Sequence, residues 1–478
     1  MILPASDALL GPDLRHGEGV ALHLSNGRID RVETGRPASG GPRRLLMPAL
    51  ANAHDHARPL SLTSFGAAFM PLETWLPRSA LATPPDPYLA AAAPLARAAR
   101  SGCAAVMVHY TRPSGTMPLL DEAKEVARAA KDVGIRMTFA LAIRDQNPLV
   151  YGSSEQVLDG LPDDIRREIE AAFVRPGMAP HDYIELTEAI ASAIESPTIQ
   201  VQFGPAGVQW CSRPLLEAIA ERSAATGRRV HMHLLETRYQ LDWARETFPQ
   251  GIVPYLKEIG LLSPRLTLAH CIYTSEADRE LIAESGATVV TNFGSNMGIR
   301  SGVAPIRQAR AAGCRVCVGM DGLAFDEDDD MLREIRLVQA LNGPWGFEEP
   351  DDRRRFLLSA IAEGRRSLGV SGSGAIAEGE PADLLVLDLD TLDRDRILPV
   401  APLDLVFARA TASHVRDLVV AGRQVVAEGR VLGIDLAAVE EELRARYRSA
   451  LANSSFLRAL PRYETALRRW YTERAGCC

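Results

Sequence analysis

Short apolar runs alternate with amphipathic segments from about residue 45 onward. Segments 117–134, 213–227 and 275–286 space their apolar residues as one face of a helix does, and each ends in glycine. Eight runs are shorter and read as buried strands. They span residues 45–54, 102–110, 135–143, 198–205, 228–236, 266–272, 287–294 and 314–322. This repetition predicts an α/β fold, a (β/α)8 TIM-like barrel.

The two ends of the chain follow a different pattern. Residues 17–35 alternate apolar and polar positions around Asn26-Gly27, a hairpin signature, and residues 374–432 are strand-rich with glycine turns. We expect both ends to form one small β-sandwich domain beside the barrel. The expected division is 1–46 and 371–432 for this domain, 47–370 for the barrel and 433–478 for a helical segment. Residues 144–197 are a long excursion, either a lid on the catalytic rim or a helical surface insertion.

Composition narrows the function classes. The chain has 478 residues and a formal net charge of −8, so it lacks the basic footprint of a nucleic-acid-binding protein. No apolar run has membrane-spanning length, and residues 1–13 lack signal-peptide features, which favours a cytoplasmic enzyme with no membrane partner. Seven scattered cysteines indicate reduced thiols. Cys314 and Cys317 fit core positions, and Cys477 and Cys478 fit an exposed end.

Histidines and carboxylates gather where the predicted strands end. His54 and His56 flank Asp55, and on an extended strand the two imidazoles share a face while Asp55 points away. Asp321 ends the eighth run, and His233 lies in the fifth. Because active sites of such barrels lie at the strand carboxyl ends, these side chains should meet. His54, His56, His233 and Asp321 would supply four ligands to a catalytic zinc or iron, with water as the fifth.

Glu236 follows three residues after His233, where its carboxylate can move protons between water and substrate. His270 lies near the end of the sixth run. His231 shares a face with His233 and is an alternative ligand, although a position deeper in the barrel is the preferred interpretation.

The order HxH, HxxE, H, SN, D resembles the amidohydrolase superfamily, and most closely its cytosine deaminase-like and chlorohydrolase-like branch. The segments NAHDH, HMHLLET, LAHC, NFGSNMGIRSGVAP and VGMDG carry the likeness. The resemblance implies that Glu236 is the proton shuttle. It also implies that His270 contacts the attacking water or the substrate, and that Asp321 both binds metal and assists proton transfer.

The resemblance also bears on the metal count and assembly. Binuclear relatives use a carboxylated lysine on the fourth strand, and TIQVQFGPAG has no lysine. One divalent ion per chain, zinc with iron as the alternative, is therefore expected. A homo-oligomer is expected because assemblies are usual in this branch. Met320 stands where the family usually has threonine, which leaves the substrate open.

Candidate substrate contacts come from three segments. The loop after the fourth run offers amides and an aromatic ring, and the loop before the eighth offers small polar groups. The candidates are Gln202, Gln209, Trp210, His109, Ser295 and Asn296. The acidic run 325–331 fits either a helix start or a negative rim favouring a neutral or cationic substrate.

These features predict a metal-dependent hydrolase, first of all a deaminase of a pyrimidine, purine, pterin or triazine-type ring. Hydrolysis of a cyclic amide, or displacement of halide or alkylamine from such a ring, is the near alternative, because the same site could perform either. Recruitment to a cyclisation or condensation stays open. A non-catalytic barrel scaffold is the alternative from another class, and it should lack some of the ligands that this chain retains.

Overall fold

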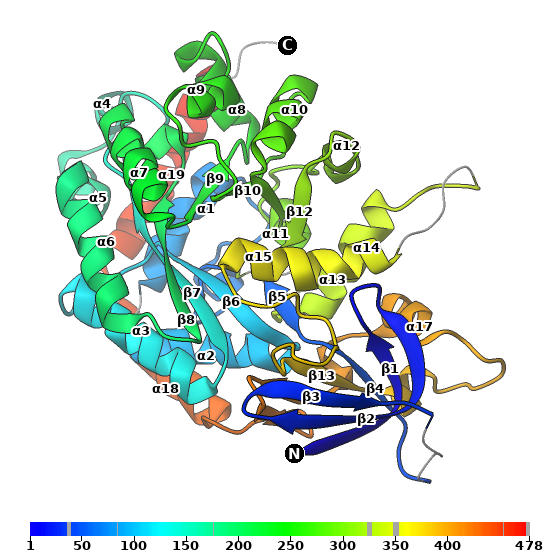
Figure 1. Ribbon diagram of the computed structural model, residues 1–478. Coiled ribbons are helices and arrows are strands. Elements are labelled where there is room, and N and C mark those ends of the chain that lie inside the picture. The colour runs from blue at the N-terminus through cyan, green and yellow to red at the C-terminus, as the bar shows by residue number, and fades with distance from the viewer. Residues whose placement is uncertain are drawn as a thin grey trace.

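A computed structural model describes residues 1–35, 40–83, 85–174, 176–322, 327–347, 353–452 and 454–474. Its central feature is an eight-stranded sheet in which every neighbouring pair is parallel and the strands follow chain order from β5 to β12 (Figure 1). The strands are β5 (Leu50–Asn52), β6 (Cys103–Tyr110), β7 (Arg136–Ile143), β8 (Ile199–Pro205), β9 (Val230–Leu234), β10 (Leu266–His270), β11 (Thr288–Thr291) and β12 (Arg315–Val318).

The two edge strands of this sheet meet. The backbone N–H of Ala53, just after β5, donates to the carbonyl of Val318 at the end of β12 (3.0 Å). The N–H of Asp321 donates to the carbonyl of His54 (2.9 Å). The sheet is therefore a nearly closed barrel, which confirms the predicted architecture and brings the first and last strand ends together.

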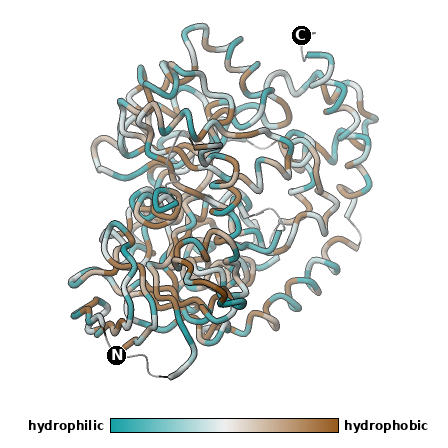
Figure 2. Tube along the Cα trace, turned by 90° about the vertical axis from the view of Figure 1, so that its right-hand side faces the viewer, coloured by the Kyte–Doolittle hydropathy of each residue, from teal (hydrophilic) through white to brown (hydrophobic). Residues whose placement is uncertain are grey.

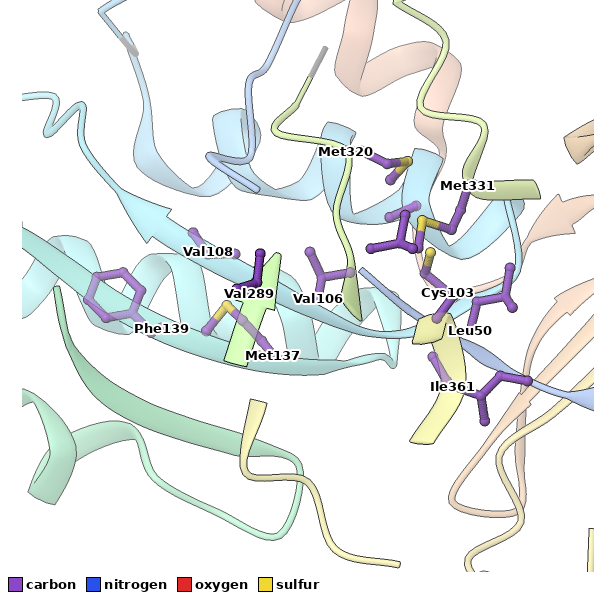
Figure 3. Packing of buried hydrophobic residues seen from close by; sticks show 14 of the residues in the cluster. Leu50, Cys103, Val106, Val108, Met137, Phe139, Val289, Met320, Met331 and Ile361 are labelled. Atoms are coloured by element: carbon purple, nitrogen blue, oxygen red, sulfur yellow. The ribbon is translucent and has the colours of Figure 1, made fainter. Parts of the chain in front are cut away.

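Side chains alternate between the barrel axis and the outer layer. Ala105 and Met107 of β6 belong to a small cluster of mostly small residues inside the barrel. Val106 and Val108 belong to the large core that joins the strands to the helices, where Figure 3 shows them with Met137 of β7. Small inward residues leave room near the axis for larger polar side chains at the strand ends.

Helices surround the barrel, and brown and teal segments alternate along them in Figure 2, as expected when one face packs inward. Gly134 and Gly227 end two of them in left-handed conformations, with φ of 95° and 76°. The helices around the barrel are α2 (Pro87–Arg100), α3 (Leu119–Val133), α6 (Pro180–Ile194), α7 (Arg213–Thr226), α8 (Arg238–Thr247), α9 (Ile252–Glu258), α10 (Glu276–Ser285), α11 (Phe293–Gly298), α12 (Ile306–Ala311), α13 (Met331–Asn342), α14 (Arg353–Leu358) and α15 (Gly364–Leu368).

A second sheet, drawn at the lower right of Figure 1, joins both chain ends in the order β16-β15-β14-β13-β4-β1-β2-β3. Its strands are β1 (Ile2–Leu10), β2 (Arg15–Ser25), β3 (Arg28–Glu33), β4 (Arg44–Pro48), β13 (Leu384–Asp388), β14 (Val415–Val420), β15 (Arg423–Ala427) and β16 (Arg430–Val431), with α16 (Leu389–Leu392) and α17 (Pro402–Arg409) nearby. β4 pairs with β13, which confirms a flanking β-domain built from both ends.

The first apolar run differs from the expected single barrel strand. Its first half is β4 of the flanking sheet, and only Leu50–Asn52 forms barrel strand β5. Pro48 lies at the division and has no N–H to continue a strand ladder.

The excursion after β7 and the C-terminal helices pack on each other. The excursion forms α4 (Glu155–Leu158), α5 (Asp163–Phe173) and α6, of which α6 packs on the barrel and the other two contact α19. The C-terminal segment is two helices, α18 (Leu436–Leu451) and α19 (Ser455–Arg474), and α19 also packs against α1 (Leu72–Ser79). Among the described residues, no helix combines the length and apolar character needed to cross a membrane.

Candidate active site

Three strand ends converge on one set of ligand atoms. Asp321 Oδ1 lies 3.2 Å from His54 Nε2 and 3.0 Å from His56 Nε2. His233 Nε2 lies 3.3 Å from His56 Nε2. Donor atoms around a four- or five-coordinate ion with bonds of about 2.0–2.1 Å are about 2.9–3.5 Å apart, so this spacing suits a single divalent cation.

Each imidazole is held through its other ring nitrogen. His56 Nδ1 donates to the carbonyl of His109 (2.8 Å), and His233 Nδ1 donates to the carbonyl of Ala206 (2.6 Å). Both Nε2 atoms then carry lone pairs that face each other, which is unfavourable without a cation between them. Backbone carbonyls behind metal-binding histidines are a recurring arrangement, because they fix the tautomer and the ring orientation.

The third imidazole has a different support. His54 Nδ1 lies 2.7 Å from Nε2 of His231, so His231 lies behind a ligand histidine. The Nε2 atom of His54 and the Oδ1 atom of Asp321 are buried and make no hydrogen bond within the described chain. Two orphaned buried acceptors aimed at one point fit a cation, and the donor set of imidazole and carboxylate suits zinc or iron.

The electrostatics agree with a metal-ligand set. Burial lowers the pKa of His54 from 6.5 to about 3, and it also lowers the pKa of His56 and His233, so these imidazoles are neutral. Burial alone would raise the pKa of Asp321, but its close contacts with His54 and His56 hold that pKa well below its usual range. Neutral imidazoles beside a carboxylate are the protonation states that bind a divalent cation.

Glu236 lies beside these ligands without belonging to them. Its Oε1 is 3.7 Å from His270 Nε2, a buried nitrogen that makes no hydrogen bond within the described chain. Burial raises the pKa of Glu236 from 4.5 to about 7, against the opposing charge of His270. A carboxyl group with this pKa can both accept and donate a proton near neutral pH.

The loop at α11 fixes two of these groups. Ser295 Oγ donates to Asp321 Oδ2 (2.5 Å), and Asn296 Oδ1 lies 2.8 Å from His270 Nδ1. His270 and Asp321 have φ of 73° and 59°, a left-handed conformation that is unfavourable for residues with a side chain. These contacts hold both side chains toward the ligand atoms despite that conformation.

Two pockets adjoin the centre. One, of about 500 Å³, is lined by His56, Arg58, Ser79, Tyr110 and Arg112 together with apolar residues; we call it the metal-side pocket. The other, of about 440 Å³, is lined by Glu73, Arg112, Arg144, Pro148 and Leu149 and by the rings of Tyr151, Phe173, Trp210, Tyr463 and Tyr471; we call it the aromatic pocket. Trp210 connects the aromatic pocket to the ligands, because its ring centroid is 6.4 Å from that of His233.

The predicted substrate contacts divide into three groups. Trp210 lines the aromatic pocket, whereas Ser295 and Asn296 contact Asp321 and His270. Gln202 lies elsewhere: its Nε2 donates to the carbonyl of Ser367 (2.9 Å).

Two further expected contacts lie outside both pockets. His109 is fully buried and its Nε2 donates to the carbonyl of Gly204 (3.1 Å), so it is an interior histidine below the ligands. Gln209 is buried and lines neither pocket, and its carbonyl accepts hydrogen bonds from Asn147 and Gln146.

The charged residues of the pockets were not found from the sequence. Glu73 accepts a hydrogen bond from Thr237 Oγ1 (2.6 Å), its Oε2 is buried without a partner in the described chain, and burial raises its pKa to about 7. The only available signal was position: Arg58 follows His56 by two residues, and Thr237 follows Glu236 directly. Glu73 and Arg112 lie in segments with no motif.

In the acidic run after Asp321, the carboxylates that the structure describes cap a helix or contact nearby side chains. Asp330 caps α13, Asp329 pairs with Arg97 (2.6 Å), and Glu327 accepts from Ser61 Oγ. None of these three lines either pocket. The helix-start interpretation holds for Asp330, whereas Asp329 and Glu327 contact residues of other segments. Residues 325 and 326 lie outside the described residues, as do Cys477 and Cys478; Cys314 and Cys317 are buried free thiols.

Comparison with known proteins places the chain in a family. The family model described as Amidohydrolase family matches residues 45–425. The chain belongs to the amidohydrolase family. The matched range contains every ligand-bearing strand end of this amidohydrolase and reaches into both parts of the flanking sheet.

Individual relatives share between a fifth and about a quarter of their residues with this chain. A 5-methylthioadenosine/S-adenosylhomocysteine deaminase of Desulfitobacterium hafniense (strain Y51) is 27% identical over 419 residues, covering 85% of this chain and 86% of the relative. A zinc-bound adenosine deaminase structure from Xanthomonas campestris is 25% identical, with a TM-score of 0.71 and coverage of 94% and 98%. A zinc complex of the atrazine chlorohydrolase TrzN from Arthrobacter aurescens TC1 shares the fold, with a TM-score of 0.73, 21% identity and coverage of 93% and 99%.

Proposed function

We propose that this amidohydrolase hydrolytically deaminates an amino-substituted nitrogen heterocycle, with an adenine-type ring as the first candidate. The observation that carries the proposal is the set of converging ligand atoms, two of them buried without a hydrogen-bond partner in the described chain, with Glu236 beside them. The names of the deaminase relatives from Desulfitobacterium hafniense and Xanthomonas campestris supply the choice of ring.

We propose His54, His56, His233 and Asp321 as the residues that hold one divalent ion, and zinc as that ion. The zinc-bound neighbours favour zinc over iron. A divalent cation in such a site activates a water molecule as nucleophile near neutral pH.

The protein's own groups then manage the protons. Glu236 accepts a proton from the attacking water and delivers it to the ring nitrogen, while the hydroxyl adds to the ring carbon that bears the amino group. The second water proton reaches the amino group through Glu236, the carbon–nitrogen bond breaks, and ammonia leaves. His270, oriented by Asn296, lies where its Nε2 can contact the oxygen that adds to the ring.

The test measures ammonia release from a panel of amino-heterocycles, together with metal content, for the wild type, Glu236→Gln and a control. Glu217→Gln is a matched control, because Glu217 is half-exposed on α7 and pairs with Arg213. We expect about one zinc per chain in all three proteins, and turnover lowered about 10²- to 10⁴-fold only in Glu236→Gln.

Other outcomes identify the alternatives. One metal without ammonia, but with ring opening or halide release, would replace deamination by cyclic amide hydrolysis or dehalogenation. No bound metal and no turnover restored by added metal would overturn the proposal in favour of a scaffold.

A further inference from the structure

Arg112 lies between the two pockets and lines both of them. It follows β6 by two residues and therefore stands at the carboxyl end of a barrel strand, on the side where the ligand histidines gather. A ligand that extends from the metal-side pocket into the aromatic pocket would pass its guanidinium group.

The lining of the pockets is unbalanced in charge. Arg58, Arg112 and Arg144 line one or both pockets, and Glu73 is the acidic residue among the lining residues. Arg58 is already engaged: its Nη2 lies 3.6 Å from Asp321 Oδ1, and its guanidinium carbon lies 4.6 Å from the centre of the Trp75 ring. The positive charge of Arg58 is therefore paired with the carboxylate of Asp321.

Arg112 has no such counter-charge in the described chain. Its Nη2 donates to the carbonyl of Leu76 (3.1 Å) and to Ser79 Oγ, both of them neutral acceptors. Burial, with the neighbouring charges of Arg144 and Arg58, lowers the pKa of Arg112 from 12.5 to about 9. A partly desolvated guanidinium normally pairs with a carboxylate or another anion.

The remaining donors of Arg112 are in position to bind a ligand. No hydrogen bond within the described residues uses its Nε or Nη1, and neither atom is among the fully enclosed polar atoms without a partner. Leu76 and Ser79 belong to the same helix, α1, and hold the Nη2 end from one side. The planar fork is thus anchored at Nη2 while its other N–H groups stay accessible, which suits a bidentate oxyanion.

We propose that Arg112 binds an oxyanion, a carboxylate or phosphate, carried by a substituent of the heterocyclic substrate. This rests on the proposed function and deepens it, because it selects anionic substrates among amino-heterocycles. Arg144 on the aromatic pocket adds positive charge on the same path.

Matched probes test the proposal. Adenosine-5′-carboxylic acid and adenosine-5′-carboxamide differ in charge but hardly in shape, and adenosine 5′-monophosphate against adenosine gives the phosphate arm. For each pair, the ratio of kcat/KM for the anionic and the neutral compound is measured in the wild type, Arg112→Met and Arg112→Lys. Arg213→Met is the control, because Arg213 is exposed on α7 and lines neither pocket.

In the wild type, we expect the kcat/KM of the anionic compound to exceed that of the neutral compound in the carboxylate pair, the phosphate pair or both. The pair that shows this preference identifies the oxyanion that Arg112 binds. In Arg112→Met the ratio for that pair should fall about 10- to 100-fold, with a smaller fall in Arg112→Lys and none in Arg213→Met. An equal fall for the charged and neutral members would overturn the proposal, since it would show that Arg112 only supports the fold.

Calorimetric binding of the same pairs separates this proposal from deamination. If no compound releases ammonia, but the wild type binds the anionic member more tightly and Arg112→Met does not, the oxyanion site stands while the proposed reaction fails. If binding shows no preference for the anionic member in either pair, the oxyanion site is rejected, whatever the turnover.

Discussion

The metal centre and the aromatic pocket lie side by side but are built in different ways. The centre takes its groups from the ends of barrel strands β5, β9, β10 and β12, and backbone carbonyls support two of its imidazoles. The aromatic pocket takes its walls from α1, the excursion after β7 and α19, segments separated by up to several hundred residues. In the proposed function, the barrel therefore carries the reacting groups, whereas the added segments carry the groups that select the substrate.

Removing a ligand should have the largest effect. Asp321→Ala deletes the carboxylate that lies within 3.2 Å of two imidazole nitrogens. We expect loss of bound metal and turnover at background, measured by elemental analysis and ammonia release. Asp242→Ala, at a half-exposed position on α8, is the control and should keep both. Stoichiometric metal in Asp321→Ala would contradict the ligand assignment.

The support behind His54 should matter less than the ligands. His231 Nε2 accepts from His54 Nδ1, so His231→Leu removes the group that fixes this ligand's tautomer. We expect metal affinity about 10- to 100-fold weaker in a chelator competition. His231→Asn, which retains an acceptor, should recover part of the loss. Equal affinity in all three proteins would make His231 a packing residue.

Glu334 supports the start of α11, the helix that carries Ser295 and Asn296. Its Oε1 accepts from the N–H of Gly294 at the start of α11, and burial raises its pKa from 4.5 to about 8. Because the folded state holds this proton more tightly than the unfolded state, the stabilising contribution is present at low pH and is lost as the pH rises through about 8. Wild type should lose more stability between pH 6 and pH 9 than Glu334→Gln, by at least about 1 kcal/mol in urea unfolding. Parallel pH profiles would refute this.

The smallest effect is expected in the pocket wall. Phe173 of α5 lines the aromatic pocket and contacts Tyr463 of α19, with ring centroids 5.8 Å apart. Phe173→Ala should raise KM about two- to tenfold, with metal content unchanged and kcat nearly unchanged. Phe248→Ala, an aromatic deletion beside Tyr255 and away from both pockets, is the control. An unaltered KM in Phe173→Ala would mean that the excursion is only a surface insertion.

The sequence predicted the metal centre better than the aromatic pocket. Eight apolar runs and their helices identified the barrel, and His54, His56, His233 and Asp321 could be placed together because parallel strands end on one face. Glu73, Arg112 and Tyr471 could not be found, because no local pattern shows which helix covers a barrel mouth. The contact of Gln202 with Ser367 could not be predicted, because alternation along β8 gives the side of the barrel wall but not the depth.

The position of α19 has a consequence for biosynthesis. Tyr463 and Tyr471 complete the aromatic pocket, yet they are synthesised more than 130 residues after Asp321, the last of the proposed metal ligands. A growing chain on the ribosome can therefore assemble its reaction centre well before it has a finished recognition surface. The aromatic pocket is complete only after α19 has left the ribosome and packed against α1 and α5.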